Sequence, residues 1–245
     1  MRFKIDFSYD GSSFHGYQKQ PGKRTVQSEI ESLLSSIDES NVKLVAAGRT
    51  DKGVNALHQI AHFDFHKEIT AYKLKGALNG RLKGDIYIND VELVEDSFHA
   101  RFSAIGKEYI YKLNMGEYNP LERNLVYQHN EKLDVVEMQR AMKYLEGTNN
   151  FKAFTKSDEE REDYVRTLSQ TNLIRDMKDV NKITLVFVGT GFMRYMVRNM
   201  VGTLIEIGEG KRRSEEIIDI IKSEDRTNAG KTANPEGLYL KNVFY

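Results

Sequence analysis

Residues 48–53, G-R-T-D-K-G, gather a carboxylate, two cations and a hydroxyl between two glycines. An Asp followed by Lys and Gly is common in turns, so a charged surface turn is the simplest local interpretation. The two glycines, however, would let a ligand approach the backbone closely. Arg49 and Lys52 can contact phosphates and hold Asp51 in its ionised form. The segment is therefore a candidate for carboxylate chemistry on a phosphate-bearing ligand.

Two further groups of side chains are candidates for a functional role. Tyr109 and Tyr111 share one face of a predicted strand, K-E-Y-I-Y-K, and that face either packs in a sheet or meets a nucleotide base. Arg194 and Arg198 lie one turn apart on a predicted helix in the run F-M-R-Y-M-V-R-N-M-V. Arginines on an amphipathic helix usually form a solvated edge. In so apolar a run, an arginine at the edge of the core needs a carboxylate or phosphate partner.

Several other chemistries have no support in the sequence. Cysteine is absent, which excludes disulfides, a thiolate nucleophile and cysteine-ligated zinc. The glycine-rich phosphate-binding motifs and the G-x-S-x-G motif are also absent. His58 and His62 are four residues apart, but on a predicted strand this spacing spans roughly 13 Å, too far for one zinc ion. We expect no metal there.

Hydrophobic periodicity places these candidates on alternating strands and helices. Thr25 and Thr70 are expected to cap the first two helices, and Asp134 begins a later helix with Glu137 completing a capping box and Gly147 ending it. Strands are predicted over residues 2–7, 57–65, 86–94, 107–113, 167–174, 183–188 and 238–244. Helices are predicted over residues 26–37, 72–82, 134–146, 192–207 and 215–221.

The order of these elements predicts an α+β fold, because strands follow strands as well as helices. We expect two split β-α-β-like lobes with antiparallel or mixed sheets. The boundary is expected near residues 103–105. The N-terminal lobe, residues 1–104, then carries the carboxylate loop, and the C-terminal lobe, residues 105–245, carries the tyrosines and arginines. The acidic residues 158–163 are expected to form an exposed loop.

Composition indicates a soluble globular protein. The 245 residues are 40% hydrophobic and 29% charged, and the formal net charge is zero. No apolar run approaches the ~18–20 residues that span a bilayer, and the N-terminus lacks the apolar region of a signal peptide. We therefore expect a cytoplasmic protein without membrane contacts. Zero net charge says little about nucleic-acid binding, which depends on where the cations lie.

The whole chain resembles the tRNA pseudouridine synthase A family, whose members isomerise uridines in the anticodon stem-loop of tRNA. The resemblance rests on motifs that occur in the family's order between residues 9 and 240. They are Y-D-G-S-S-F-H-G-Y-Q-K-Q from Tyr9, T-V-Q-S-E-I-E from Thr25, G-R-T-D-K-G-V from Gly48, F-H-A-R-F-S-A from Phe98, K-E-Y-I-Y from Lys107, F-M-R-Y-M-V-R-N-M-V-G from Phe192 and G-L-Y-L from Gly237.

The resemblance implies roles for individual residues. Asp51 corresponds to the family's catalytic aspartate. Tyr109 corresponds to the tyrosine that stacks on the target base and assists proton removal. Arg198 corresponds to the basic residue paired with the aspartate, and Arg49 to the arginine that fills the space left by the flipped nucleotide. Further substrate contacts are expected from Gln18, Gln20, Thr50, Lys52, Gly53, Arg101 and Arg194.

The resemblance also implies an architecture and a reaction. The two lobes would join their sheets across a central active-site cleft, and the protein would be a homodimer whose two subunits both contact tRNA. Uridine would become pseudouridine at positions 38, 39 and/or 40, without a cofactor or metal, because the reaction breaks N1–C1′ and joins C5 to C1′ with no atoms gained. The aspartate can attack C1′ (an acylal route), attack C6 (a Michael route) or deprotonate the sugar (a glycal route). The sequence leaves these routes open.

Two other functions agree less well with the sequence. Uridine 5-methylation also attacks C6, but it needs a cysteine, which the chain lacks. A catalytically weak or inactive paralogue that only binds RNA would tolerate loss of Asp51, Tyr109 or Arg198, and all three are present. Asn55 and Asn149 stand where the family commonly has His, and Asn cannot carry a proton near neutral pH. We expect these two residues to alter packing or loop contacts rather than to abolish activity, and the sequence leaves open which of the three uridines are modified.

Overall fold

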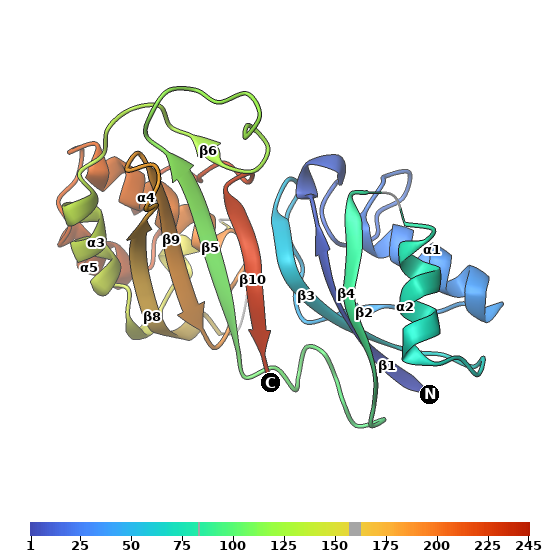
Figure 1. Ribbon diagram of the computed structural model, residues 1–245. Helices are drawn as coiled ribbons and strands as arrows, with labels where there is room; N and C mark the ends of the chain where they lie inside the picture. The colour runs from blue at the N-terminus through green and yellow to red at the C-terminus, as the bar shows by residue number, and fades with distance from the viewer. Residues whose placement is uncertain (83, 157–162) are drawn as a thin grey trace. The chain divides into compact units, whose positions relative to one another are not determined.

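The computed structural model describes residues 1–82, 84–156 and 163–245. Most of the acidic segment, residues 158–162, therefore lies outside the described residues. The chain divides into two compact units (Figure 1). The first comprises Met1–Ile105 with Tyr239–Tyr245, and the second comprises Gly106–Leu238. The predicted boundary between residues 104 and 105 stays a prediction.

The first unit is a mixed sheet with helices α1 and α2 on one face (Figure 1). β1 lies between β3 and β4 and is antiparallel to both, while β10 pairs parallel with β3. The short β2 pairs antiparallel with β3. The strands are β1 (Arg2–Tyr9), β2 (Val45–Ala46), β3 (Asn55–Asp64), β4 (Ile86–Val94) and β10 (Leu238–Phe244). The helices are α1 (Val26–Asp38), α2 (Ala71–Asn79) and a 3-10 turn, η1 (Gly11–Ser13).

Alternation along β1 explains how this sheet forms its core. Phe3, Ile5 and Phe7 are buried, while the residues between them are only partly covered. The helix α1 begins where the sequence predicts, because the Thr25 hydroxyl accepts from the Ser28 backbone N–H. The Ser28 hydroxyl accepts in return from the Thr25 backbone N–H, so a capping box forms at this end. Thr70 caps α2 through one exposed bond, in which its hydroxyl accepts from the Lys73 N–H at 3.4 Å.

The second unit is also a mixed sheet with helices. β9 lies between β5 and β8, and β7 pairs with β8; all these pairs are antiparallel, and β6 runs parallel to β5. The strands are β5 (Gly106–Asn114), β6 (Tyr127–Gln128), β7 (Gly147–Asn150), β8 (Val165–Arg175) and β9 (Lys182–Gly189). The helices are α3 (Val135–Lys143), α4 (Met196–Gly208), α5 (Glu216–Ser223) and the 3-10 turns η2 (Lys152–Phe154) and η3 (Arg226–Asn228).

The helix α4 is the most deeply buried element of this unit, and a polar residue anchors it. Asn199 is fully buried, and its amide donates to the Phe154 carbonyl at 2.7 Å. Its side-chain oxygen accepts from Arg226 and from Thr232. Because burial of an amide costs free energy unless it is hydrogen-bonded, these contacts tie η2 and the segment after η3 to α4.

The structure confirms the mixed α+β architecture in each unit and corrects several local predictions. The helix α3 ends at Lys143 rather than before Gly147, which instead begins β7. The predicted capping box of α3 does not form: Asp134 does accept from the Glu137 N–H, but the Glu137 carboxylate bonds to Ser214. The Asp134 N–H donates instead to the Gly208 carbonyl. The helix α4 begins at Met196 rather than at residue 192, for a reason given below. Within the described residues, no helix has the length and apolar character needed to cross a membrane.

We predict that Thr25→Ala lowers the free energy of unfolding by about 1–2 kcal/mol, because a buried cap with a reciprocal partner is lost. Thr70→Ala is the matched control, and we expect it to cost about 0.5 kcal/mol, since its one bond is long and exposed. Urea unfolding followed by circular dichroism measures both values. Equal losses in the two variants would contradict the account of α1.

Candidate active-site residues in the two units

The predicted carboxylate loop is the connection between two paired strands. β2 and β3 pair as a hairpin, with Val45 opposite His62 and Ala46 opposite Ala61. One more backbone bond, from the Ala47 N–H to the Ile60 carbonyl at 2.8 Å, extends the ladder. The chain then leaves the sheet for residues 47–54, here called the Asp51 loop. The hairpin thus fixes both ends of the loop on neighbouring strands.

The Asp51 loop contains a tight turn whose first residue is Asp51 itself. The Val54 N–H donates to the Asp51 carbonyl at 3.1 Å, which closes a four-residue turn. Gly53 occupies the third position with φ +79°. A positive φ at this position characterises type II turns and favours glycine. The local turn interpretation was therefore correct about the backbone, and the side chain of Asp51 is presented from that turn, partly buried.

The segment after β1 packs against the end of this loop. Gly11 approaches Val54 so closely that a Cβ on Gly11 would lie 2.1 Å from the Val54 carbonyl oxygen. The Gly11 N–H donates to the Asn55 side-chain oxygen at 2.8 Å, in a buried position. Asn55 thus takes part in a buried contact with the segment after β1. Asn149 also has a local contact, since its side-chain nitrogen lies 3.4 Å from the Glu146 carbonyl.

The loop's own side chains divide into exposed and engaged ones. Arg49 and Lys52 are exposed on either side of Asp51. The Thr50 side chain is buried, and its hydroxyl lies 2.8 Å from the hydroxyl of Tyr9 at the end of β1. Burial raises the pKa of Tyr9 to about 12, so this tyrosine is protonated at any physiological pH. The Thr50 hydroxyl is therefore hydrogen-bonded within the protein.

Two predicted contact residues, Gln18 and Gln20, lie in the segment that leads to α1. Both are exposed. The Gln20 side chain donates to the His15 carbonyl at 2.9 Å. The same segment touches the Asp51 loop, because the Tyr17 N–H donates to the Thr50 carbonyl at 3.1 Å. The segment that carries these two glutamines is thus attached to the loop.

Arg101 lies on an exposed aromatic ridge of the first unit. Its guanidinium is 5.7 Å from the centre of the Phe102 ring, and that ring is 77% exposed. Phe102 stacks on His99 at 4.3 Å. A cation beside stacked rings is an arrangement that suits contact with nucleotide bases.

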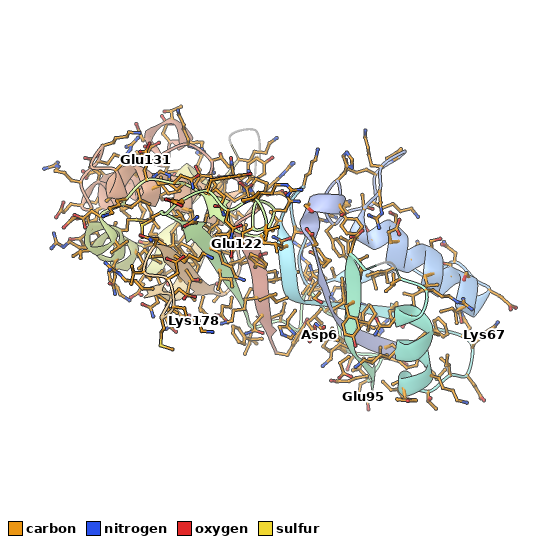
Figure 2. The ribbon with its side chains drawn as sticks, turned by 45° about the horizontal axis from the view of Figure 1, so that its top comes forward. Asp6, Lys67, Glu95, Glu122, Glu131 and Lys178 are labelled. Atoms are coloured by element: carbon orange, nitrogen blue, oxygen red, sulfur yellow. The ribbon has the colours of Figure 1, made fainter. Side chains whose placement is uncertain are left out.

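The two histidines of β3 have separate partners. The His58 ring nitrogen lies 2.8 Å from the Asp6 carboxylate, which Figure 2 labels. His62 is buried, accepts from the Ala100 N–H at 3.1 Å, and lies 4.7 Å from the His99 ring. Burial lowers the pKa of His62 to about 4. Among the described residues, no group of three or more His, Asp or Glu side chains is arranged to hold a metal ion.

In the second unit, the two candidate tyrosines of β5 have different surroundings. Tyr111 is fully buried, and its hydroxyl donates to the Asn234 carbonyl at 2.9 Å. Burial raises the pKa of Tyr111 well above its usual value. Tyr109 is also buried, and its ring meets Phe192 edge-on at 5.0 Å between ring centres. Tyr111 is therefore a packing residue, which leaves Tyr109 as the functional candidate.

The two candidate arginines lie on either side of one tyrosine in the sequence. Tyr195 adopts a left-handed conformation with φ +64°, and α4 therefore begins only at the next residue, Met196. Arg194 consequently precedes the helix, and the prediction that Arg194 and Arg198 are one helical turn apart is wrong. Both guanidiniums nevertheless meet the Tyr195 ring, at 5.3 Å and 4.9 Å. The Arg198 Nε also donates to the Ala233 carbonyl at 2.7 Å.

The basic run at residues 211–213 is paired with carboxylates. Arg212 bonds to Glu206 at 2.7 Å, and Lys211 lies 2.6 Å from Glu209. Arg213 lies 3.8 Å from Glu216. Pairing of this kind neutralises much of the field that a basic run would otherwise present to RNA.

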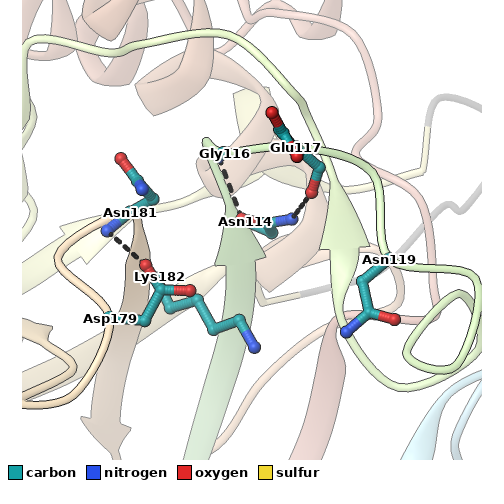
Figure 3. A pocket seen from close by; sticks show the side chains of 7 residues that line it. All are labelled: Asn114, Gly116, Glu117, Asn119, Asp179, Asn181 and Lys182. Carbon is teal, nitrogen blue, oxygen red and sulfur yellow. Dashed lines mark hydrogen bonds between the residues drawn. The ribbon is translucent and has the colours of Figure 1, made fainter.

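A separate cavity of about 390 Å³ lies at one end of the second unit's sheet (Figure 3). Its polar groups are largely bonded to one another; the Asn114 amide, for example, bonds to the backbone of Gly116 and Glu117. None of the predicted site residues lines it. The lining residues are Asn114, Gly116, Glu117, Asn119, Asp179, Asn181 and Lys182.

Each described unit is thus a mixed sheet with helices. The first unit carries a carboxylate on a hairpin loop, and the second carries a buried tyrosine on a strand and an arginine on a buried helix. A family model described as tRNA pseudouridine synthase matches residues 7–103 and 141–245. A tRNA pseudouridine synthase A from Geobacillus sp. is 43% identical over 246 residues, covering 100% of this chain and 98% of the relative. Those from Streptococcus pneumoniae and Bacillus subtilis are 42% and 40% identical, cover 100% of this chain, and are themselves covered to 98% and 99%. The chain belongs to the tRNA pseudouridine synthase A family, which confirms the resemblance.

Sequence reasoning missed three residues that contact the candidate site residues. Tyr9 and Gln59 bond to the Asp51 loop, and Tyr195 meets both arginines. Tyr9 and Tyr195 occur within motifs that had been recognised, but periodicity marks Tyr9 only as a core residue. Gln59 could have been found from the sequence, because it is a polar residue on the apolar face of a predicted strand.

We predict that protonation of His62 contributes to acid destabilisation. The folded His62 stays neutral down to about pH 4, whereas the unfolded residue takes up a proton near pH 6.5. The unfolded state therefore binds more protons in this window, and the free energy of unfolding falls as the pH decreases from 6.5 to 4. His62→Gln should make this decline shallower in urea unfolding at several pH values. The exposed His15→Gln is the control, and an identical pH slope in wild type and His62→Gln would refute the assignment.

Proposed function

We propose that this protein isomerises uridine to pseudouridine at positions 38, 39 and/or 40 of the tRNA anticodon stem-loop, with Asp51 as the catalytic nucleophile or base. The observation that carries the proposal is full-length membership of the tRNA pseudouridine synthase A family together with a carboxylate on a constrained loop between two cations. The enzyme is an isomerase, because the product contains the same atoms as the substrate. The reaction itself therefore consumes no second substrate.

Asp51 is proposed to act at the sugar or the base. The N1–C1′ bond breaks, the base rotates, and C5 joins C1′; the proton on C5 is then lost and N1 gains one. A carboxylate that attacks C1′ or C6, or that removes a sugar proton, must be ionised and partly shielded from bulk water. The partly buried position of Asp51, with Arg49 and Lys52 next to it in the chain, supports this role.

Tyr109 and Arg198 are proposed to assist. Tyr109 is held edge-on by Phe192, so its ring has a defined orientation for stacking on the target base, and its hydroxyl or a water that it holds can accept the C5 proton. The Arg198 guanidinium is fixed through its Nε by the Ala233 carbonyl. A fixed cation of this kind is suited to stabilising the ionised aspartate. The proposed catalytic residues are drawn from both units.

The tRNA is proposed to be bound by exposed cations and amides. A uridine must leave its stack before reaction, which costs a few kcal/mol, and Arg49 is proposed to fill the vacated space. Arg194 and Lys52 would contact phosphates, and Arg101 with Phe102 would contact the sugar-phosphate chain or an unstacked base. Gln18, Gln20, Thr50 and Gly53 complete the proposed substrate-binding set; for Thr50 and Gly53 the contribution is to loop shape.

The arrangement of the lobes and the oligomeric state are part of the same proposal. We propose two split β-α-β-like lobes, divided near residue 105, that join across a central active-site cleft, and a homodimer in which both subunits contact tRNA. Family membership supports these statements. The cytoplasm, where bacterial tRNA is modified, is the proposed location.

We predict that Asp51→Asn abolishes tritium release from tRNA labelled at uridine C5, by at least a thousandfold, while tRNA binding is retained. The amide is nearly isosteric with the carboxylate but is neither nucleophilic nor basic. Asp90→Asn, which alters an exposed aspartate of β4, is the control and should react at the wild-type rate. Turnover by Asp51→Asn at the wild-type rate would reject the mechanism, and a wild-type protein that binds tRNA without releasing tritium would indicate an RNA-binding paralogue.

We also predict where pseudouridine appears. Product tRNA treated with carbodiimide and copied by reverse transcriptase should give stops that correspond to positions 38, 39 or 40. The flipped uridine must come from the stem-loop that fits the family's site, so stops elsewhere in the tRNA would reject the proposed substrate positions. tRNA incubated with Asp51→Asn provides the background.

A further inference from the structure

We propose that Tyr9 and Gln59 are positioning residues that set the placement of the Asp51 loop through two hydrogen bonds, one buried and one partly buried. The proposal rests on the proposed function in one respect, because it takes Asp51 as the reacting group. It concerns residues of β1 and β3 that lie under the loop, outside the set expected to touch the substrate.

The sheet register brings these two side chains to the same buried face. Gln59 lies opposite Phe7, and Tyr9 lies opposite Ala56, so the pairing shifts by one residue between Phe7 and Tyr9. A shift of this kind is a bulge, and bulges re-aim the side chains next to them. Tyr9 is 5% exposed and Gln59 is fully buried. Two polar side chains therefore lie in the core directly where the hairpin gives way to the loop.

Gln59 continues the hairpin's hydrogen bonding after the backbone ladder has ended. A backbone bond joins the Ala47 N–H to the Ile60 carbonyl. The carbonyl of the following residue, Gly48, accepts from the Gln59 side-chain nitrogen at 2.9 Å. A side chain thus replaces the backbone donor at the first residue of G-R-T-D-K-G, which fixes the direction in which the chain leaves the sheet.

Tyr9 holds the loop from the same side, two residues later. Its hydroxyl lies 2.8 Å from the Thr50 hydroxyl, immediately before Asp51. The Thr50 carbonyl is held separately by the Tyr17 N–H. Gly48 and Thr50 are thus both tied down, and Arg49 between them projects to the exterior. Displacements of well under an ångström matter for a reacting group, so these bonds bear on the position of Asp51.

A glutamine at this position of the core lowers the stability of the fold, because it buries a polar atom that an apolar side chain would not. The Gln59 side-chain oxygen is buried and has no hydrogen-bond partner among the described residues. A methionine or leucine at position 59 would remove that cost, but it would also remove the donor to the Gly48 carbonyl. The contact with the loop accounts for a glutamine here.

Tyr17 provides a matched control within the same structure. It is 2% exposed and contacts the same loop, but its hydroxyl has no hydrogen-bond partner among the described residues. Its attachment to Thr50 uses the backbone N–H, which a substitution to phenylalanine leaves intact. Tyr9→Phe and Tyr17→Phe therefore remove the same atom from similar surroundings, and only the first removes a bond to the loop.

The test measures single-turnover tritium release and tRNA affinity for Tyr9→Phe, Gln59→Met and Tyr17→Phe. We expect Tyr9→Phe and Gln59→Met to slow the chemical step by about three- to tenfold each, the effect of losing one net hydrogen bond, with the Kd for tRNA unchanged. Tyr17→Phe should react within twofold of wild type. The Tyr9 hydroxyl also interacts with the Gln59 side chain, so a double-mutant cycle with Thr50→Val should show that Tyr9→Phe has a smaller, not an equal, further effect once the Thr50 hydroxyl is gone.

Hydrogen exchange of the loop amides gives a readout that does not need activity. Peptides covering residues 49–54 should exchange faster in Tyr9→Phe and Gln59→Met than in wild type, and at the wild-type rate in Tyr17→Phe. Wild-type exchange in the first two variants, or equal effects of all three, would overturn the proposal. A wild-type enzyme that releases no tritium would instead reject the proposed function, while the exchange result would still decide whether these residues position the loop.

Discussion

Burying a polar atom costs free energy unless it is hydrogen-bonded, and bonds of this kind hold the irregular segments next to the candidate site residues of each unit. In the first unit, the Asn55 side chain binds the Gly11 N–H, and Gln59 binds the Gly48 carbonyl. In the second unit, Asn199 collects contacts from η2 and from the segment after η3, and Arg198 is bonded to Ala233 in that segment. Apolar packing brings the elements together, but these directional bonds decide how the irregular segments lie on them.

The structure also shows that two interpretations of the G-R-T-D-K-G segment are compatible. A turn residue pattern predicts a tight turn, and Gly53 at φ +79° provides one. The proposed function assigns chemistry to the same residues. Under that proposal the turn serves the chemistry, because it presents the Asp51 side chain from a backbone held at both ends. Local propensity describes how the loop is built, and only its tertiary contacts and its family describe what it is for.

The regular elements of this fold follow from sequence periodicity, because alternation in β1 and the cap at Thr25 act through neighbouring residues. The family motifs identify Asp51, Tyr109 and Arg198 as candidates. The start of α4 could not be predicted, since a left-handed conformation is uncommon for a residue other than glycine and the pattern of residues gives no sign of it at Tyr195. The capping box of α3 failed for a different reason: Glu137 finds Ser214, far along the chain, as its partner. The hydrogen-bond partner of Gln59 could not be predicted either, because it depends on the register of the strands.

The left-handed conformation of Tyr195 lowers the stability of the fold, but the same residue provides the aromatic ring that Arg194 and Arg198 contact. A bulky residue with φ +64° pays a backbone penalty that glycine would not. A glycine there would ease the chain into α4, but it would also remove the ring that meets Arg194 and Arg198. If Arg198 assists Asp51 as proposed, variants chosen only for resistance to heat would lose this tyrosine, whereas variants chosen for turnover would keep it. The residue marks a trade-off built into the helix's first turn, where a more stable protein need not be a better enzyme.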